Sequence, residues 1–340
     1  MYKKFVDKKS KMDWKKFEVT KMGRLDKVLT QELNQSRNQV EQLIKEGLVK
    51  VNGKIVVKTG KKLLAGESIS YIFKEVVPKE AVTIDFDVEI LYEDEVMMVV
   101  NKPSGLVVHP APSVKEATLV DWLIHKGISL STISGEERHG IVHRIDKDTT
   151  GALVIAKTNE AHQKLSEQLQ DKSMGRYYLA IIDCPLKSNG IVEKPIGRNP
   201  NNRLKMDVSP RGKEAKSAFC KLVETGSLHN SQKNLELIAV KLFTGRTHQI
   251  RVHLESLGRH ILGDSLYGFK SKKDTIDRVF LHAYKLYMFH PTTNRRMEFV
   301  APLFADMQEF INKKFNQGDV NEKINPSTID TYFSTITERM

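Results

Sequence analysis

The chain has 340 residues, of which 40% are hydrophobic and 28% charged, so its composition is that of an ordinary globular protein and excludes a disordered or fibrous one. Lys and Arg outnumber Asp and Glu by 54 to 42, and +10 of the resulting +12 charge lies within residues 1–62. A basic segment ahead of a nearly neutral body is typical of a nucleic-acid-binding protein, although an acidic membrane surface would attract it too.

The cysteine content and the length of the apolar runs indicate the cellular compartment of the protein. Cys184 and Cys220 are too few and too far apart for a disulfide framework or a cysteine-rich zinc site. No apolar run approaches the roughly 18 residues that a membrane span needs, and the lysine-rich N-terminus lacks the apolar stretch of a signal peptide. We therefore expect a cytoplasmic monomer with no membrane partner.

The first 76 residues are predicted to hold a basic arm and a small module. Residues 1–19 carry repeated lysines with little periodicity, which indicates a mobile arm. In residues 20–76, apolar residues at helical spacing predict one helix from Leu25 to Leu33 and a second from Ser36 to Gly47. An Asn-Gly turn at residues 52–53 then joins two short apolar runs and predicts a hairpin.

Beyond a linker at Pro78, residues 77–315 are predicted to be rich in strands. Strand-like runs occupy residues 88–100, 151–156, 178–182, 235–242 and 279–286, and helical periodicity appears at 119–125, 161–169 and 250–257. Strands without regular alternation with helices favour an α+β fold with a mixed, largely antiparallel sheet. The polar segment 316–340 is expected to be a loosely held tail.

The first polar segment of the body lies between two apolar runs at residues 139–157. It contains Arg144, Asp146 and Asp148, and loops on rigid scaffolds are where reactive groups sit. Read alone, the segment is equally compatible with a simple ion pair between Arg144 and either aspartate. The loop by itself therefore does not choose between the two carboxylates.

The second polar segment, residues 244–253, leads into a predicted helix. It holds Arg246, His248, Arg251 and His253, and a helix N-terminus is itself favourable for anions. The two histidines are five residues apart, whereas two ligands on one helical face need a spacing of four. We therefore expect structural histidines and no metal site.

Several motifs in one order resemble a known family. They are His-Arg-Ile-Asp at 143–146, Thr-Thr-Gly at 149–151, Arg-x-Tyr-x-Ala at 176–180 and Thr-Gly-Arg-Thr-His-Gln-Ile-Arg-Val-His at 244–253, with further matches at 99–109, 263–268 and 281–283. Together they resemble the pseudouridine synthases of the large-subunit rRNA type (RluA- and RluD-like), and the match spans about residues 85–300. Ile145 stands where the family usually has leucine. The N-terminal unit resembles the small RNA-binding module first described in ribosomal small-subunit protein number four.

The resemblance implies roles for individual residues. Asp146 would be the single catalytic carboxylate, Arg251 would hold it ionised and aimed, and Tyr178 would stack on the uracil or move a proton. The residues implied to bind RNA are Arg144, which would fill the gap left by a flipped uridine, Arg246 and His248 in the second segment, and Arg37, Lys45, Lys50 and Lys54 in the module. No metal, nucleotide or other cofactor is implied.

Two other classes of function stay open at this point. A non-catalytic rRNA-binding or ribosome-assembly factor would use only the basic module, and it predicts losses at Asp146, Tyr178 or Arg251, all of which are present. A nuclease using His139, His143 and His253 would need a metal or a second acid or base. The expected partner is RNA, by analogy the 23S-type ribosomal RNA, and the sequence does not name the uridine.

Overall fold

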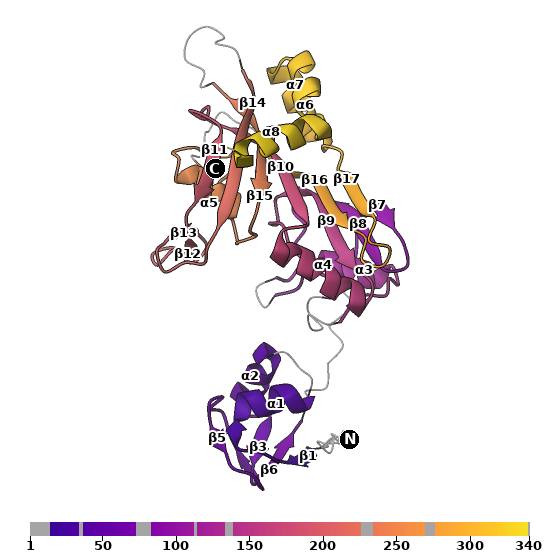
Figure 1. Ribbon diagram of the computed structural model, residues 1–340, viewed down its shortest axis with the longest axis vertical. Helices are drawn as coiled ribbons and strands as arrows, with labels where there is room; N and C mark the ends of the chain where they lie inside the picture. The colour runs from indigo at the N-terminus through magenta and orange to yellow at the C-terminus, as the bar shows by residue number, and fades with distance from the viewer. Residues whose placement is uncertain are drawn as a thin grey trace, which may run out of the picture. The chain divides into compact units, whose positions relative to one another are not determined.

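The computed structural model describes residues 14–33, 37–72, 83–111, 114–132, 139–225, 234–268 and 276–338. The chain divides into two compact units, Met1–Val82 and Thr83–Met340, and each has hydrophobic clusters of its own (Figure 1).

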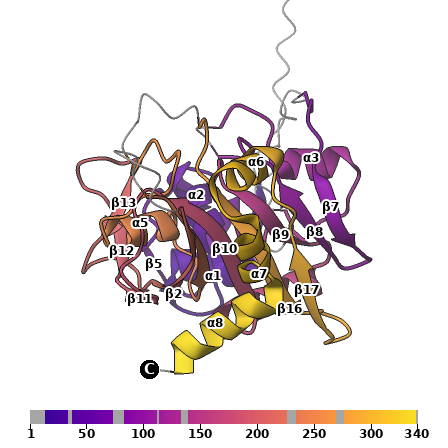
Figure 2. The same cartoon turned by 90° about the horizontal axis from the view of Figure 1, so that it is seen from above.

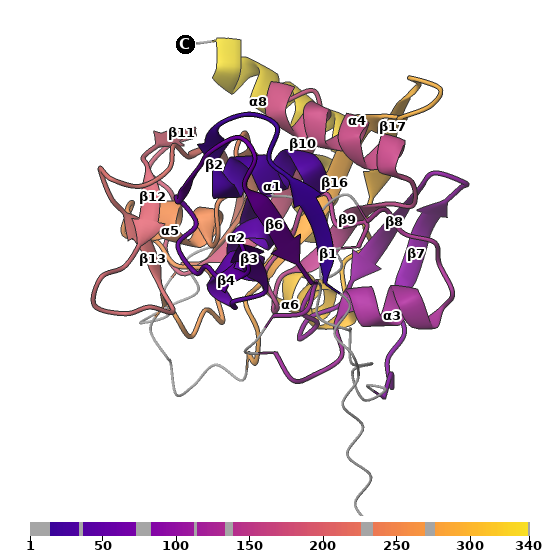
Figure 3. The same ribbon diagram turned by 90° about the horizontal axis from the view of Figure 1, so that it is seen from below.

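The first unit packs two helices against short strands. Its four-stranded sheet has the order β1 (Lys15–Glu18), β6 (Ser68–Tyr71), β3 (Val49–Val51) and β4 (Lys54–Ile55), and β2 (Gly23–Arg24) pairs with β5 (Lys62–Leu63). Helices α1 (Leu25–Leu33) and α2 (Arg37–Lys45) share one apolar core with β3 and β6 (Figure 3). The predicted hairpin is present, and Asn52 and Gly53 have the positive φ values, 49° and 79°, that its two-residue turn needs.

The end of the predicted basic arm differs from expectation. Lys15–Glu18 form strand β1, antiparallel to β6, and are therefore part of the folded unit. The reason is an apolar pair hidden among the lysines, because Phe17 lies edge-on to Tyr71 and Val19 is buried. Residues 1–13 of the predicted arm lie outside the described residues.

The second unit is built on a nine-stranded sheet. Its order is β11 (Gly190–Glu193), β14 (Lys216–Glu224), β15 (Glu236–Leu242), β10 (Gly175–Ile182), β16 (Leu281–Phe289), β9 (Thr150–Ala156), β8 (Met97–Lys102) and β7 (Glu89–Glu93), and β17 (Arg296–Val300) pairs with β16. All pairings are antiparallel except that of β16 with β9, which confirms the predicted α+β class with a mixed, largely antiparallel sheet. The remaining elements before residue 300 are β12 (Ile196–Arg198), β13 (Met206–Val208), α3 (Leu119–His125), α4 (Asn159–Asp171) and α5 (Gln249–Glu255).

The side chains of strand β10 point alternately to the two faces of this sheet. Because successive side chains of a strand point to opposite faces, Tyr177 and Leu179 enter one core whereas Tyr178 and Ala180 enter another. The first core is shared with helices that follow residue 304, and the second is shared with α5. The polar segments singled out in the sequence belong to the second face.

The segment after residue 315 was predicted to be a loosely held tail, and here it is folded. Following α6 (Ala305–Lys314), helices α7 (Gln317–Lys323) and α8 (Pro326–Glu338) lie along the sheet (Figure 2). Val320, Ile329 and Phe333 are buried in the core around Tyr177. Ile324, Tyr332 and Ile336 pack against the same core as partly buried side chains, so the polar composition of residues 316–338 describes mainly their outer surface.

Candidate active site

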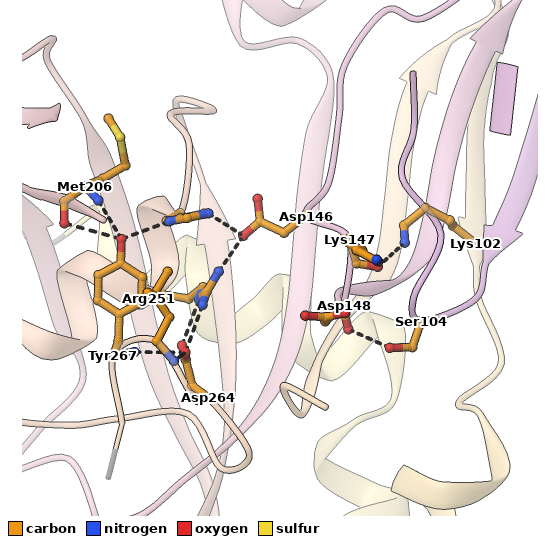
Figure 4. A network of polar contacts seen from close by, with 11 residues as sticks. Lys102, Ser104, Asp146, Lys147, Asp148, Met206, Arg251, Asp264 and Tyr267 are labelled. Carbon is orange, nitrogen blue, oxygen red and sulfur yellow. Dashed lines mark hydrogen bonds and ion pairs between the residues drawn. The ribbon is translucent and has the colours of Figure 1, made fainter. Parts of the chain in front are cut away.

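The loop that carries Asp146 is anchored from a neighbouring strand. Lys102, at the end of β8, is fully buried, and its Nζ donates hydrogen bonds to the carbonyls of Pro103, Leu106 and Lys147 at 2.8–2.9 Å (Figure 4). The third carbonyl belongs to the residue that follows Asp146. A buried ammonium with three acceptors therefore fixes the backbone on which the carboxylate is mounted.

The exit of the loop into β9 requires a glycine. Gly151 has φ 113°, and a Cβ at this position would lie 2.3 Å from the carbonyl oxygen of Ala283 on β16. This is where β9 and β16 make their parallel pairing, through residues 150 and 151. The segment that follows Asp146 is thus held to the sheet at two points, Lys147 and Gly151.

Arg251 joins two carboxylates. Its Nε and Nη2 donate to Asp264 Oδ2 and Oδ1 at 2.7 and 2.8 Å, and its Nη1 donates to Asp146 Oδ2 at 3.3 Å (Figure 4). The side chain of Asp264 is fully buried, whereas that of Asp146 is 21% exposed. Asp264 therefore fixes the guanidinium from behind, and Asp146 is the carboxylate that a ligand can reach.

Arg251 and Asp264 each favour the ionised form of the other. Burial by itself lowers the pKa of Arg251, but the hydrogen bonds and charge of Asp264, with the charge of Asp146, raise it above its ordinary value. Burial by itself raises the pKa of Asp264, but Arg251 and the N–H groups of Tyr267 and Leu266 lower it below its usual range. Both groups are therefore fully ionised near neutral pH.

His248 faces Asp146 from the start of α5. Its Nε2 lies 4.0 Å from Asp146 Oδ2, and its Nδ1 lies 2.9 Å from the hydroxyl of Tyr267, which accepts a hydrogen bond from the N–H of Met206. Burial lowers the pKa of His248 and outweighs the opposing charge of Asp146, so the imidazole is neutral near pH 7. If the Tyr267 hydroxyl donates to Nδ1, the ring proton is on Nε2 and is directed toward Asp146.

Asp146, His248 and Arg251 line one pocket. Its polar lining includes Arg144, Asp146, Arg176, Tyr178, Arg246, His248 and Arg251. Burial raises the pKa of Tyr178, and the nearby charge of Arg176 opposes that effect without cancelling it, so the phenol is protonated at neutral pH. A carboxylate, a neutral imidazole and a phenol thus meet in one cleft, a set of groups suited to proton transfer and to stabilising charge on a ligand.

Asp148 has a different environment from Asp146. It is exposed, its backbone carbonyl accepts a hydrogen bond from Ser104 Oγ at 3.3 Å, and the described residues that line the pocket include Asp146 but not Asp148 (Figure 4). Arg144 is exposed at the pocket, and Arg246 is half-buried there with its Nε donating to the carbonyl of Glu214.

His253 is a structural histidine, as expected from the sequence. Its Nδ1 lies 3.0 Å from Ser217 Oγ, and its Nε2 lies 3.0 Å from the carbonyl oxygen of Lys194. Gln249 binds the same strand, β14: its side-chain amide donates to the carbonyl of Lys216 and to Ser217 Oγ. In the part of the chain that the structure describes, no three His, Cys, Asp or Glu side chains are placed to hold a metal ion.

The predicted RNA-binding residues of the first unit have varied surroundings. Lys45 is exposed and 3.5 Å from Glu41, Lys50 Nζ lies 3.9 Å from the ring centroid of Trp14, and Lys54 is exposed next to the hairpin turn. Arg37 opens α2, and its side chain lies outside the described residues.

Sequence reasoning missed three residues of the site. Asp264 and Tyr267 lie within the 263–268 motif, and Lys102 lies within the 99–109 motif, so the resemblance marked their segments without giving them a role. The signal that identifies them is three-dimensional, because each binds a residue of another segment, 13, 19 and 45 positions away for Asp264, Tyr267 and Lys102.

Comparisons with known proteins match both units of the chain to described families. A family model described as RNA pseudouridylate synthase matches residues 96–256, and one described as S4 domain matches residues 23–69. The chain is 48% identical over 314 residues to an "Uncharacterized RNA pseudouridine synthase" of Helicobacter pylori (strain J99), covering 91% of this chain and 95% of that protein. It is 38% identical to the "Ribosomal large subunit pseudouridine synthase D" of Xylella fastidiosa, covering 81% of this chain and 84% of that protein.

A solved human structure is also similar to this chain. The human protein "RNA Pseudouridylate Synthase Domain Containing 4" has a TM-score of 0.50 at 24% identity, over 66% of this chain and 92% of that one, which shows a shared fold. No helix in the described ranges is long and apolar enough to cross a membrane. With a relative that is nearly half identical over almost its whole length, the chain belongs to the RluA family of RNA pseudouridine synthases and carries an N-terminal S4 RNA-binding domain.

Proposed function

We propose that this synthase converts uridines of large-subunit ribosomal RNA to pseudouridine and that Asp146 is its catalytic carboxylate. The observation that carries the proposal is the contact of Asp146 Oδ2 with Arg251 Nη1 at 3.3 Å inside a pocket lined by Tyr178. The choice of ribosomal RNA is supported by the S4 domain and by the name of the Xylella relative. Family membership sets aside the nuclease, and the experiment below tests the non-catalytic alternative.

The reaction needs a reachable, ionised carboxylate. The N1–C1′ bond of uridine breaks, the base turns, and a C5–C1′ bond forms while C5 loses a proton and N1 gains one. Asp146 acts at C1′, either as a nucleophile or by stabilising the positive charge that develops there. Arg251 holds the carboxylate in place, and because Asp264 already binds two of its nitrogen atoms, its own position is fixed before substrate binds.

The other pocket residues bind the target nucleotide. Tyr178 stacks on the uracil or moves a proton, and its raised pKa keeps the phenolic proton in place. Exposed Arg144 fills the gap that the flipped uridine leaves in the RNA. Arg246 and His248 contact the RNA at the mouth of the pocket, where both are partly exposed.

The S4 domain supplies a second RNA-binding surface. Arg37, Lys45, Lys50 and Lys54 contribute positive charge on α2 and on the hairpin that follows it. Lys45 and Lys54 are exposed, and their ammonium groups are accessible to phosphate.

The experiment compares two neighbouring aspartates. Asp146→Asn removes the charge with almost no change in shape, so it should abolish single-turnover formation of pseudouridine on transcribed large-subunit rRNA while RNA affinity and thermal stability stay close to wild type. Asp148→Asn is the matched control and should keep the wild-type rate. An active Asp146→Asn variant beside an inactive Asp148→Asn variant would show that the assignment of the carboxylate is wrong. If wild-type protein binds large-subunit rRNA but forms no pseudouridine in it or in transfer RNA, the chain is a non-catalytic factor.

A further inference from the structure

The pocket contains a buried arginine, Arg176, that has no part in the proposed function. Arg176 lies on β10, two residues before Tyr178, and both side chains line the pocket that holds Asp146. Only 8% of Arg176 is exposed. Within the described ranges its Nε has no hydrogen-bond acceptor and no carboxylate pairs with its guanidinium.

Other buried cations of this unit have acceptors for their donors: Lys102 binds three backbone carbonyls, and three further cations pair with carboxylates. Arg251 binds Asp264, Arg278 binds Asp306, and Lys285 binds Asp330. A buried charge without a partner destabilises a fold, and for that reason such charges are rarely kept for structural reasons. Burial lowers the pKa of Arg176 and no carboxylate opposes that effect, which is the signature of an uncompensated cation.

The guanidinium also packs closely against a neighbouring turn. It lies against the turn that precedes α5, where a Cβ at Gly245 would be 2.7 Å from Nη1. The absence of a side chain at Gly245 therefore makes room for Arg176. A buried planar donor set beside Tyr178 and in the same cleft as Asp146 is suited to a ligand with acceptor oxygens.

We propose that Arg176 binds the uracil of the target nucleotide and stabilises the negative charge that the base carries after the N1–C1′ bond breaks. The inference rests on the proposed function of Asp146. The bonding pair of N1–C1′ stays with the base, and its charge is shared by N1, O2 and O4. The C5–C1′ bond then forms, C5 loses its proton and N1 is protonated, so the positive charge of Arg176 is needed most while the base is detached.

A backbone phosphate is the other anion that a guanidinium could bind, and burial argues against it. Arg144 is exposed and Arg246 is half-buried, so these two arginines are reachable by the RNA backbone. Arg176 is more deeply buried than either and shares its strand and its face with Tyr178, the residue assigned to the base.

The test is a single-turnover measurement with Arg176→Met at saturating RNA. Removing one preorganised donor to a developing anion should lower the saturated rate by about 10² to 10³. RNA affinity and its salt dependence should stay within twofold of wild type. Thermal stability should not fall, because the substitution removes an uncompensated buried charge. The control Arg295→Met, at an exposed position in the β16–β17 turn, should leave all three quantities unchanged.

Two further measurements identify the base as the ligand. Gly245→Ala places a methyl group against the guanidinium and should reproduce the loss of rate with Arg176 still present. A 5-fluoro substituent on the target uridine makes the base a more stable leaving anion, so the defect of Arg176→Met, measured as loss of the fluorouridine, should shrink several-fold.

Each contrary result has a distinct meaning. An unchanged saturated rate with weaker binding and a flatter salt dependence would show that Arg176 binds phosphate, and an unchanged rate with unchanged binding would show that it does not contact substrate. A fall in melting temperature that accounts for the lost activity would assign it a structural role. Any of these overturns the inference while Asp146→Asn stays inactive, whereas an active Asp146→Asn variant would overturn the proposed function itself.

Discussion

At the residue scale, the position of Asp146 depends on a chain of contacts. Arg251 contacts Asp146, Asp264 binds Arg251 through two hydrogen bonds, and the ring of Tyr267 lies 4.8 Å from the guanidinium. The order of burial follows the same chain, from the reachable carboxylate to the fully buried one. The rigidity of the site therefore originates in residues that do not touch the substrate.

Arg251→Lys tests this chain of contacts. Lysine keeps the charge but loses the planar fork that binds Asp264, and it cannot hold both carboxylates in the same geometry. We expect the single-turnover rate to fall by about 10² or more, since small misplacements of a reacting group have effects of that size. Rates are measured at saturating RNA for this variant and for Arg259→Lys, an arginine just beyond α5 whose side chain donates to the backbone carbonyls of Pro185, Leu257 and Gly258.

The control should keep the wild-type rate. An unchanged rate for Arg251→Lys would mean that the fork of Arg251 does not position Asp146.

The sequence predicted part of this site and missed another part for a physical reason. The spacing of residues within one segment is visible in a sequence, so Asp146 and Arg251 could be selected from motif order. The contacts that hold them, from Asp264 and Lys102, join segments that meet only after folding. Arg176 belongs to the Arg-x-Tyr-x-Ala motif at 176–180, but its Nε without a hydrogen-bond acceptor among the described residues becomes visible only when its surroundings are known.

At the scale of elements, a partly buried aspartate joins two turns of the sheet. Asp94, between β7 and β8, accepts hydrogen bonds from Tyr92 and from the N–H groups of Val96 and Met97, and its Oδ2 lies 2.7 Å from His290 Nε2 at the end of β16. Burial by itself raises the pKa of Asp94, but these hydrogen bonds lower it to about 2. The ionised form is therefore the one that stabilises the fold.

This shift predicts how stability depends on pH. A carboxylate whose pKa is lower in the folded state stabilises the protein above its unfolded pKa, and the stabilisation is lost as pH falls from about 4 to about 2. Asp94→Asn should lower the free energy of unfolding by about 2 kcal/mol at pH 7, and the difference should vanish near pH 2. Denaturant unfolding at several pH values measures it, with the exposed neighbour Glu95→Gln as the control.

Stability of Asp94→Asn that runs parallel to wild type at every pH would contradict the assignment. Glu95→Gln should follow wild type throughout.

Elements differed in how well the sequence predicted them. The hairpin at Asn52 is local, because two residues with positive φ define its turn, and it was predicted correctly. Helices α7 and α8 depend on a distant partner, since Ile329 and Phe333 are buried in a core shared with Tyr177 and strand β14, both more than a hundred residues earlier in the chain. A polar composition with a few apolar residues reads as a tail until that sheet is known.

At the scale of the whole molecule, the chain consists of two units whose cores are separate. The apolar cluster of the S4 domain lies entirely within residues 17–71, and the clusters of the second unit lie beyond residue 83. Asp146, Tyr178 and Arg251 all belong to the second unit.

Removal of residues 1–72 should therefore separate binding from chemistry. The shortened protein should bind structured rRNA more weakly and with a flatter salt dependence, because fewer phosphates are neutralised and fewer counterions released. Its single-turnover rate at saturating RNA should equal that of the full chain. Binding constants at two salt concentrations and a saturated rate measure both effects. Equal affinity and equal salt slope for the two proteins would refute a role of the S4 domain in binding this RNA.

The most direct test of the whole account is a map of pseudouridine in the RNA of cells with and without this protein. We expect one or more positions of large-subunit rRNA to lose pseudouridine when the protein is absent, and to regain it with the wild-type chain or Asp148→Asn but not with Asp146→Asn. Recovery of these positions by Asp146→Asn, or losses confined to transfer RNA, would contradict the account.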